Sequence, residues 1–334
     1  MRTKDSFQSS LAAEMRRYIS LKQALGRDFD APARVLRKLD HFLCNGGKPS
    51  PDLTAETFQQ WCLTMESSCS NVRRARMHIV RNFCLYRRRT APACFVPDRT
   101  QFPRVGPTIP PYIFSDREVA QLLRQSAAIP GSVRSPLRGV ATRLAIILLY
   151  TTGLRRGELL RLTADDYDSS AQTFLIRASK FHKFRLLPLA RDVATEVEQF
   201  LKAHHALRPP LPAQAPLLWN PYCGGRAYSA TRLAKNLHIL FNLAGIQKPD
   251  GRLPRIHDFR FSFAVNALLR WYRNGAPVQA KLPFLAAYMG HVSVLSTYYY
   301  LRFIEPLRSV ANRRFRERYG SLVTPPPKPK GGDQ

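Results

Sequence analysis

The chain has 334 residues, of which 52 are Lys or Arg and 23 are Asp or Glu, and its formal net charge is +29. A chain of this length can bury a substantial core, and the length favours two domains. The basic residues are spread along the whole chain, and this distribution indicates a nucleic-acid partner. Charge alone does not separate a DNA enzyme from a ribosome-associated protein or from a generic basic surface.

The sequence predicts neither export nor a membrane span. The N-terminal stretch MRTKDSFQSS lacks the apolar region of a signal peptide, and no apolar run approaches the roughly 18 residues that a membrane helix needs. We therefore expect a cytoplasmic protein, associated with the nucleoid and without a membrane partner. The six cysteines form no C-x-x-C pair, so we expect reduced thiols, no metal site and no cofactor.

Residues 1–91 predict a helical domain, because apolar residues recur at helical spacing in about four segments. The last of these segments has an apolar face that includes Ile79 and Phe83. Its remaining positions are strongly basic, and a solvated surface and a phosphate-binding face are equally favoured there. The predicted DNA-binding arginines on this face are Arg73, Arg74, Arg76 and Arg81.

A proline-rich segment, residues 92–113, predicts a semi-rigid linker, since prolines stop a continuing helix. Ser115 followed by Glu118 is typical of a capping box and opens the first helix of a second domain. We expect this second domain over residues 114–320, followed by a disordered tail over residues 321–334.

The second domain is predicted to be mainly helical with a small antiparallel sheet. Residues 140–150 are apolar nearly all round, as in a central buried helix. Residues 173–179 and 184–189 indicate two strands of a hairpin. Further helices are expected over residues 233–243, 259–271, 283–289 and 297–318. The predicted fold class is therefore mainly α with a small antiparallel β-sheet (α+β).

Three stretches carry side chains suited to phosphate chemistry. In TTGLRRGELLRL, Gly153 ends one helix, and Glu158 lies close enough in the next to orient the guanidinium of Arg155. Such a guanidinium can bind two phosphate oxygens, although for this stretch in isolation an ion pair of purely structural function is slightly favoured. In RIHDFRFSF, His257 and Arg260 share one side of a helix start.

The third stretch, MGHVSVLSTYYY, holds His291 and three successive tyrosines, Tyr298, Tyr299 and Tyr300. Taken alone, a histidine or an aromatic cluster is usually part of a core. Taken together and in chain order, however, the three stretches and the lysines of the hairpin supply guanidinium groups, an ammonium group, imidazoles and a phenol. These are the chemical groups that a phosphodiester transesterification needs.

From about Ser115 to Leu301 the chain resembles the catalytic domain of the tyrosine recombinases, the phage-integrase family, through T-G-L-R-x-x-E-L, H-D-x-R and G-H-x(8)-Y in the family's order. The resemblance implies a helical DNA-clamping domain before it and a catalytic set supported by Glu158. That set comprises Arg155, Lys180, His257, Arg260, His291 and Tyr300.

The chain departs from the family pattern at several positions. The hairpin lacks the common G-K-G, so Lys183 competes with Lys180 as the catalytic lysine and is otherwise a DNA contact. Phe261 follows the middle arginine where the family commonly has histidine. The segment after Arg260 is a few residues longer, around residues 270–274. Tyr298 and Tyr299 compete with Tyr300, whose spacing from His291 fits best.

The resemblance implies cleavage of double-stranded DNA through a 3′-phosphotyrosyl link, without ATP or metal. It also implies a homotetramer assembled on two DNA sites, in which residues 302–320 dock on a neighbouring protomer, with accessory DNA-binding proteins as possible partners. An acidic group, Asp165, Asp166 and Asp168, could bind Mg²⁺, but a solvated turn is favoured.

The leading hypothesis is a site-specific recombinase or integrase of a mobile element. The first alternative is a type IB topoisomerase, which shares the chemistry but does not exchange partners. The second is a catalytically silent DNA-binding protein of the same fold. A binding protein has no need for Lys180 and Tyr300 together, which argues against the second alternative.

Overall fold

The structure is a computed structural model, and it describes residues 7–45, 52–107, 109–133, 135–177, 184–207, 214–220, 226–291 and 293–301. The chain divides between Ile109 and Pro110 into two compact units. Among the described residues, no helix is both long and apolar enough to cross a bilayer. The five cysteines in these ranges are free thiols.

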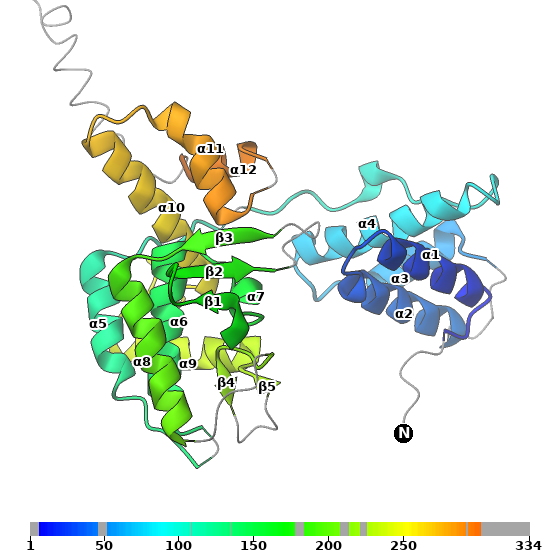
Figure 1. Ribbon diagram of the computed structural model, residues 1–334. Helices are drawn as coiled ribbons and strands as arrows, with labels where there is room; N and C mark the ends of the chain where they lie inside the picture. Colours follow the sequence, from blue (N-terminus) through cyan, green and yellow to red (C-terminus); the bar gives the residue numbers. More distant parts are fainter. Residues whose placement is uncertain are drawn as a thin grey trace, which may run out of the picture. The chain divides into compact units, whose positions relative to one another are not determined.

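The first unit is a bundle of the four predicted helices (Figure 1). They are α1 (Ala12–Ala24), α2 (Asp30–Asn45), α3 (Ala55–Leu63) and α4 (Ser70–Arg87). Their apolar faces meet in one core that includes Met15, Leu36 and Phe83. Arg87 is 5% exposed and pairs with Glu14 and Asp52, so the last residue of α4 is tied to the rest of the bundle.

Residues 92–113 are predicted to form a linker, but in the structure the first part of this segment packs on the helical bundle. Phe102 is buried in the core of the first unit, next to the short 3₁₀ helix η1 (Arg99–Gln101). Arg81 donates to the carbonyl of Pro97 at 2.5 Å, and Arg74 donates to the carbonyl of Pro103 at 2.8 Å. The prolines stop the helix, but backbone carbonyls left without a helical partner accept bonds from α4 instead.

The second unit is built around α6 (Arg138–Thr152), which is buried on nearly all sides as its sequence predicts. Helices α5, α8, α9 and α10 pack against it. The bounds are α5 (Asp116–Ser126), α7 (Arg156–Leu159), α8 (Arg191–Leu207), α9 (Ala230–Leu243), α10 (Ile256–Arg273), α11 (Val278–Met289) and α12 (Leu295–Leu301). The predicted capping box of Ser115 and Glu118 opens α5, with Ser115 N donating to Glu118 Oε2 at 2.8 Å.

A small antiparallel sheet of β1 (Tyr167–Asp168), β2 (Thr173–Ile176) and β3 (Arg185–Pro188) lies beside these helices (Figure 1). In register, Phe174 pairs with Leu187, and both side chains enter the core. A second pair of strands is formed by β4 (Trp219–Asn220) and β5 (Arg226–Ala227). The hairpin between β2 and β3 is present as predicted, although Lys180 and Lys183 lie outside the described residues.

Two details near the site differ from the sequence prediction. Helix α11 begins at Val278, and Pro283 lies inside it instead of starting it. The proline removes one backbone donor, while the buried face that includes Leu282 and Met289 continues across it. The longer segment at residues 270–274 simply extends α10, which runs to Arg273. Of the predicted last helix, residues 302–318 lie outside the described residues.

Candidate active site

The turn between α6 and α7 places Arg155 at a helix start. Gly153 ends α6 in the left-handed conformation, with φ of 63°. A Cβ on this glycine would also lie 2.5 Å from a ring carbon of Phe263, so two independent constraints exclude a larger residue. Arg155 is the N-cap of α7, and its side chain is 34% exposed. The tight turn therefore places the partly exposed guanidinium of Arg155 next to the buried helix α6.

Glu158 holds Arg155 in place by two bonds, as predicted. Arg155 Nη1 donates to Glu158 Oε1 at 2.7 Å, and Arg155 N donates to Oε2 at 3.0 Å. The guanidinium also donates to the carbonyl of Gly290 at 2.9 Å. Burial by itself raises the pKa of Glu158, but hydrogen bonds and charge from Arg185 and Arg155 outweigh burial and lower that pKa to about 2. The carboxylate is therefore ionised at any physiological pH.

Arg260 is the most enclosed cation of the site, with 1% of its surface exposed. It donates to the carbonyl of Gly153 at 2.5 Å and to the carbonyl of Met289 at 2.8 Å. Burial, followed by the charge of Arg155, lowers the pKa of Arg260 to about 10, while Tyr300 and Glu158 raise it. The guanidinium therefore remains charged at neutral pH and joins the ends of α6 and α11.

His291 is neutral and its tautomer is set by two neighbours. Arg260 Nη2 lies 2.7 Å from His291 Nε2, and since a guanidinium only donates, Nε2 must accept. The proton is then on Nδ1, which donates to the buried Thr297 Oγ1 at 2.8 Å. Burial and the charges of Arg260, Arg155 and Arg185 lower the pKa of His291 to about 4.

Of the three tyrosines, Tyr300 faces this cluster. It is 4% exposed, and its ring stacks on His291 with centroids 5.8 Å apart and planes 12° apart. Phe261 packs edge-on against it at 5.0 Å, so the phenylalanine that departs from the family pattern forms part of the wall around Tyr300. Tyr298 is 43% exposed, and the ring of Tyr299 contacts Phe261 and the ring of Tyr300, with centroids 6.1 and 6.5 Å away.

His257 lies at the edge of the cluster and is exposed. Its ring contacts Phe261 edge-on at 5.2 Å. Partial desolvation, followed by the charges of Arg260 and Arg255, lowers the pKa of His257. The structure thus brings five predicted residues into one region, namely Arg155, Glu158, Arg260, His291 and Tyr300, with His257 beside them.

Arg185, which is not among the predicted site residues, also binds Glu158. Its Nη2 lies 2.9 Å from Glu158 Oε2, and its side chain is 12% exposed. Strand alternation contained a signal, because Arg185 lies on the same face of β3 as the buried Leu187. A cation on the core side of a strand needs a buried partner. Two guanidinium groups, those of Arg155 and Arg185, thus bind one carboxylate, and with the charge of Arg260 the site has surplus positive charge.

In the acidic group before the hairpin, Asp165 and Asp168 are exposed, as the predicted solvated turn requires, but Asp166 is buried. Asp166 is 4% exposed, accepts from Thr163 N at 2.9 Å and pairs with Arg177 Nε at 2.5 Å. It caps the 3₁₀ helix η2 (Ala164–Asp166). Burial is possible because each carboxylate oxygen of Asp166 has a donor. Within the described ranges, no three His, Cys, Asp or Glu side chains form a group that could hold a metal ion.

Three of the four predicted DNA-binding arginines of α4 have hydrogen-bond partners within the first unit. Arg74 and Arg81 bind the carbonyls of Pro103 and Pro97, and Arg76 Nη1 lies 3.3 Å from Ser68 Oγ. Arg73 is partly buried. Because a guanidinium has five donors, these bonds leave donors available for a phosphate.

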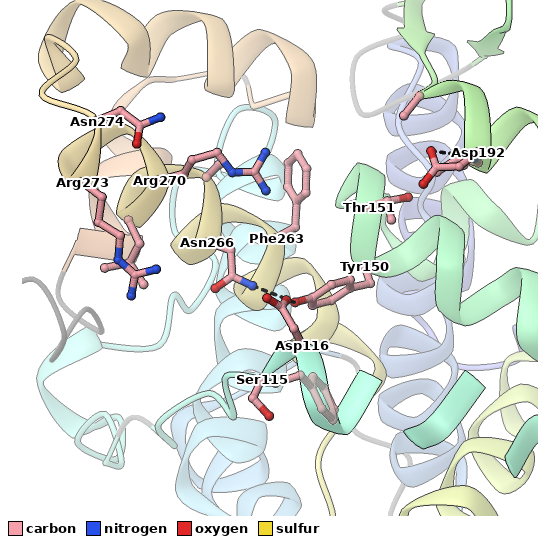
Figure 2. Close-up of a pocket in the computed structure, with 15 residues that line it drawn as sticks. Ser115, Asp116, Tyr150, Thr151, Asp192, Phe263, Asn266, Arg270, Arg273 and Asn274 are labelled. Carbon is pink, nitrogen blue, oxygen red and sulfur yellow. Dashed lines mark hydrogen bonds between the residues drawn. The ribbon is translucent and has the colours of Figure 1, made fainter. Parts of the chain in front are cut away.

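A separate hollow of about 850 Å³ lies between the start of α5, the end of α6 and the end of α10. Figure 2 shows the Tyr150 hydroxyl between Asp116 and Asn266, to which it is bonded at 2.7 and 2.9 Å. Arg270 and Arg273, from the longer segment after Arg260, line the same hollow. None of the predicted catalytic residues lines it, so this hollow is distinct from the arginine cluster.

Comparison with known proteins identifies the family of this chain. Residues 114–304 match the phage integrase family. A putative integrase/recombinase of Sinorhizobium fredii, y4rE, is 32% identical over 311 residues, which cover 93% of this chain and 97% of that relative. The chain belongs to the phage integrase family. This integrase-family protein is also 29% identical to the tyrosine recombinase XerD of Listeria innocua, in a match that covers 59% of this chain and 60% of XerD.

Solved structures share the fold of this integrase-family protein. The XerH site-specific recombinase in a post-cleavage complex with difH substrate has a TM-score of 0.61 at 19% identity, covering 95% of this chain and 85% of that one. The Tn1549 transposon integrase in complex with a circular intermediate DNA has a TM-score of 0.57 at 17% identity. This match covers 86% of this chain and 94% of that one. The predicted family, the predicted fold class and the assignment to the site-specific recombinases are confirmed.

The state of His291 predicts a pH dependence of stability. The pKa of His291 is about 4 in the folded protein and 6.5 without burial. The unfolded chain therefore binds the proton more readily, so the contribution of His291 to the free energy of unfolding is complete above pH 6.5 and is lost as the pH falls toward 4. We expect the free energy of unfolding to decrease by about 2 to 3 kcal/mol from this group across that window. His291→Gln keeps an acceptor for Arg260 but does not titrate, so its unfolding free energy is expected to decline less. Urea unfolding from pH 7 to pH 4 measures the difference, and parallel profiles for the two proteins would contradict the assignment.

Proposed function

We propose that this recombinase cleaves and rejoins double-stranded DNA at specific sites through a 3′-phosphotyrosyl link to Tyr300, in the service of a mobile genetic element. The observation that carries the proposal is the meeting of Arg155, Arg260, His291 and Tyr300 from separate segments in one positively charged site. Relatives named integrase/recombinase and the likeness to a transposon integrase support the mobile-element role.

The two predicted catalytic arginines would bind the non-bridging oxygens of the scissile phosphate. Arg155 offers a partly exposed guanidinium, and Arg260 contributes charge from within the site. Donors fixed in advance stabilise the charge that develops in the transition state without further reorganisation. Binding of the phosphate would raise the pKa of the neutral His291, because a nearby negative charge favours the protonated imidazole. Protonated at Nε2, it would donate a further hydrogen bond to the phosphate, and a phosphate oxygen would replace Nε2 as the acceptor for Arg260 Nη2.

The phenol of Tyr300 would attack the phosphorus and release a 5′ hydroxyl. A phenol with a reference pKa of about 10 is a weak nucleophile at neutral pH, so the cationic site and a proton acceptor such as His257 would assist it. Lys180, outside the described residues, would protonate the departing oxygen, with Lys183 as its rival. The phosphotyrosyl bond conserves the bond energy, and a 5′ hydroxyl from a partner strand can therefore reverse the step without ATP or metal.

Duplex DNA would be held by both units, and the basic face of α4 would bind phosphates in the first of them. The net charge of +29 and the DNA-bound structures that share the fold support this partner. With six or more phosphates neutralised, the affinity would fall on the order of a thousandfold between low and moderate salt. We place the protein at the nucleoid for this reason.

The arginines of α4 predict a change in the salt dependence of binding. Arg76→Gln is expected to weaken binding equally for all DNA sequences and to reduce the slope of log affinity against log salt by about one. Arg74→Gln is expected to do the same and also to lower stability, because it loses the bond to the Pro103 carbonyl. Arg17→Gln, an exposed change on α1, serves as the control. Fluorescence anisotropy over a salt series measures the slopes. An unchanged slope for Arg76→Gln would show that Arg76 does not contact a DNA phosphate.

Strand exchange would take place in a homotetramer on two DNA sites, with or without accessory DNA-binding proteins. In that assembly residues 302–320, which carry more basic than acidic residues, would dock on a neighbouring protomer. The mass of the assembly formed on a duplex with two sites tests this part of the proposal.

Two assays test the proposed reaction. A nicked suicide substrate traps the covalent adduct, which a type IB topoisomerase would also form. A plasmid with two copies of the element's end sequence distinguishes the two activities, since a recombinase joins the two sites and a topoisomerase relaxes any supercoiled plasmid. Absence of an adduct on every tested element end would support the silent DNA-binding alternative.

A further inference from the structure

We propose that Arg185 is a positioning residue of the recombination reaction: by sharing the carboxylate of Glu158, it leaves the charge of Arg155 available to the scissile phosphate. This inference rests on the proposed function, because it concerns how the same site binds phosphate. No predicted catalytic role falls on Arg185, which enters the site from the hairpin and not from the turn that carries Arg155.

The first support is the geometry of the bond to Glu158. Arg185 Nη1 and Nη2 lie 3.2 and 2.9 Å from the two carboxylate oxygens, an arrangement in which the planar fork spans both oxygens. Arg155 Nη1 shares Oε1 at 2.7 Å. The carboxylate therefore lies between two guanidinium groups that approach it from different elements.

A second support is the tie between Arg185 and the turn that carries His291. Arg185 Nε donates to the carbonyl of Tyr288 at 3.0 Å. A Cβ on Gly290 would lie 2.6 Å from Arg185 Nη1, so the guanidinium occupies the space that a side chain at Gly290 would need. Arg185 thus joins β3, α7 and the end of α11, and it fixes the position of the turn whose carbonyl Arg155 also binds.

The third support is the balance of charge. The side chain of Glu158 is 2% exposed, and a buried carboxylate must be neutralised by nearby cations. If Arg155 were its sole bonded partner, the pair would be neutral as a whole and would attract a phosphate weakly. With Arg185 bound on the other oxygen, the trio keeps one net positive charge, and Arg155 is the more exposed of its two cations, 34% against 12%.

Other charged groups around Glu158 set the background for a pH test. Arg260 and His291 act on its charge from α10 and from the turn after α11. Glu158 also borders a small cavity that is lined by charged residues of both signs. These are Arg161, Asp165, Asp166 and Arg177. These groups are common to the wild type and to any variant at residue 185, so a difference between the proteins reports on Arg185.

The test compares Arg185→Gln with Arg185→Lys in single-turnover cleavage of a suicide substrate at saturating DNA, from pH 5 to pH 8. Both side chains are shorter than arginine and can hydrogen-bond to Glu158, but lysine alone keeps the charge. We expect Arg185→Gln to cleave on the order of 10 to 100 times more slowly. It should also lose rate toward low pH, because the carboxyl of Glu158 is protonated more readily. Arg185→Lys should recover much of the rate and show no added acid limb, and DNA affinity should change little in either variant.

A double change adds an independent readout. In a Glu158→Gln background, Arg185→Gln should cause little further loss of cleavage rate, since the two residues act through one contact. Equal losses for the Gln and Lys variants at every pH, full rate in both, or failure of both to fold would each overturn the proposal. If the wild type formed no adduct at all, the proposed function would fail; if it formed the adduct and residue 185 did not matter, this inference alone would fail.

Discussion

Replacing Tyr300 with Phe is expected to abolish formation of the covalent protein–DNA adduct, with a loss on the order of 10⁴-fold or more in cleavage rate. The change removes only the hydroxyl, which is the proposed nucleophile. The ring contacts to His291 and Phe261 remain, so the folded protein and its DNA affinity are expected to stay close to the wild type. A suicide substrate followed by denaturing gel electrophoresis measures the adduct, and anisotropy measures binding.

The neighbouring tyrosines provide matched controls for this experiment. Tyr298 is 43% exposed, and Tyr299 contacts Phe261 and Tyr300, whereas Tyr300 is the tyrosine whose ring stacks on His291. Tyr298→Phe and Tyr299→Phe are therefore expected to form the adduct. An adduct with Tyr300→Phe, or a phosphotyrosyl peptide that maps to Tyr298 or Tyr299, would show that the nucleophile is assigned wrongly.

Replacing Arg260 with Met is expected to reduce both stability and cleavage strongly. The side chain is 1% exposed, and its loss leaves two backbone carbonyls and His291 Nε2 without their donor. Each buried acceptor left unsatisfied costs about 1 to 3 kcal/mol, so we expect a decrease in unfolding free energy of about 3 to 5 kcal/mol. Loss of a fixed cation at the phosphate is expected to reduce the cleavage rate by at least about 10².

Urea unfolding and single-turnover cleavage separate the two effects of Arg260→Met. Arg260→Lys keeps the charge but has one nitrogen, which cannot reach the carbonyls of Gly153 and Met289 and the imidazole together as the guanidinium does. We expect it to recover part of the cleavage rate and less of the stability. Arg252→Met is the control, because Arg252 is 70% exposed and its ion pair with Asp250, at 3.7 Å, is a surface pair of about 1 kcal/mol or less. An effect of Arg260→Met no larger than this control would contradict the central position of Arg260.

Local features of the chain could be predicted because they depend on residues close in sequence. The helices of the first unit, the buried α6, the capping box at Ser115 and the stop at Gly153 all follow from spacing and from backbone preferences within a few residues. The pairing of Arg155 with Glu158 belongs to the same class, since helix geometry brings residues three apart together. Local rules were weaker at Pro283, where packing of the helix face overrode the preference of one residue.

What the sequence by itself determined is therefore the set of elements, the surplus of positive charge and the chemical types of the candidate site, including the position of Tyr300 by its spacing from His291. Tertiary structure alone decided which donors meet which acceptors: Arg155 reaches a carbonyl 135 residues away, Arg260 fixes the tautomer of His291, and Arg185 shares Glu158. The burial that sets the pKa values of Glu158 and His291 has the same origin. These contacts join segments distant in sequence, and no spacing rule applies to them because their geometry exists only after the helices and the sheet have packed.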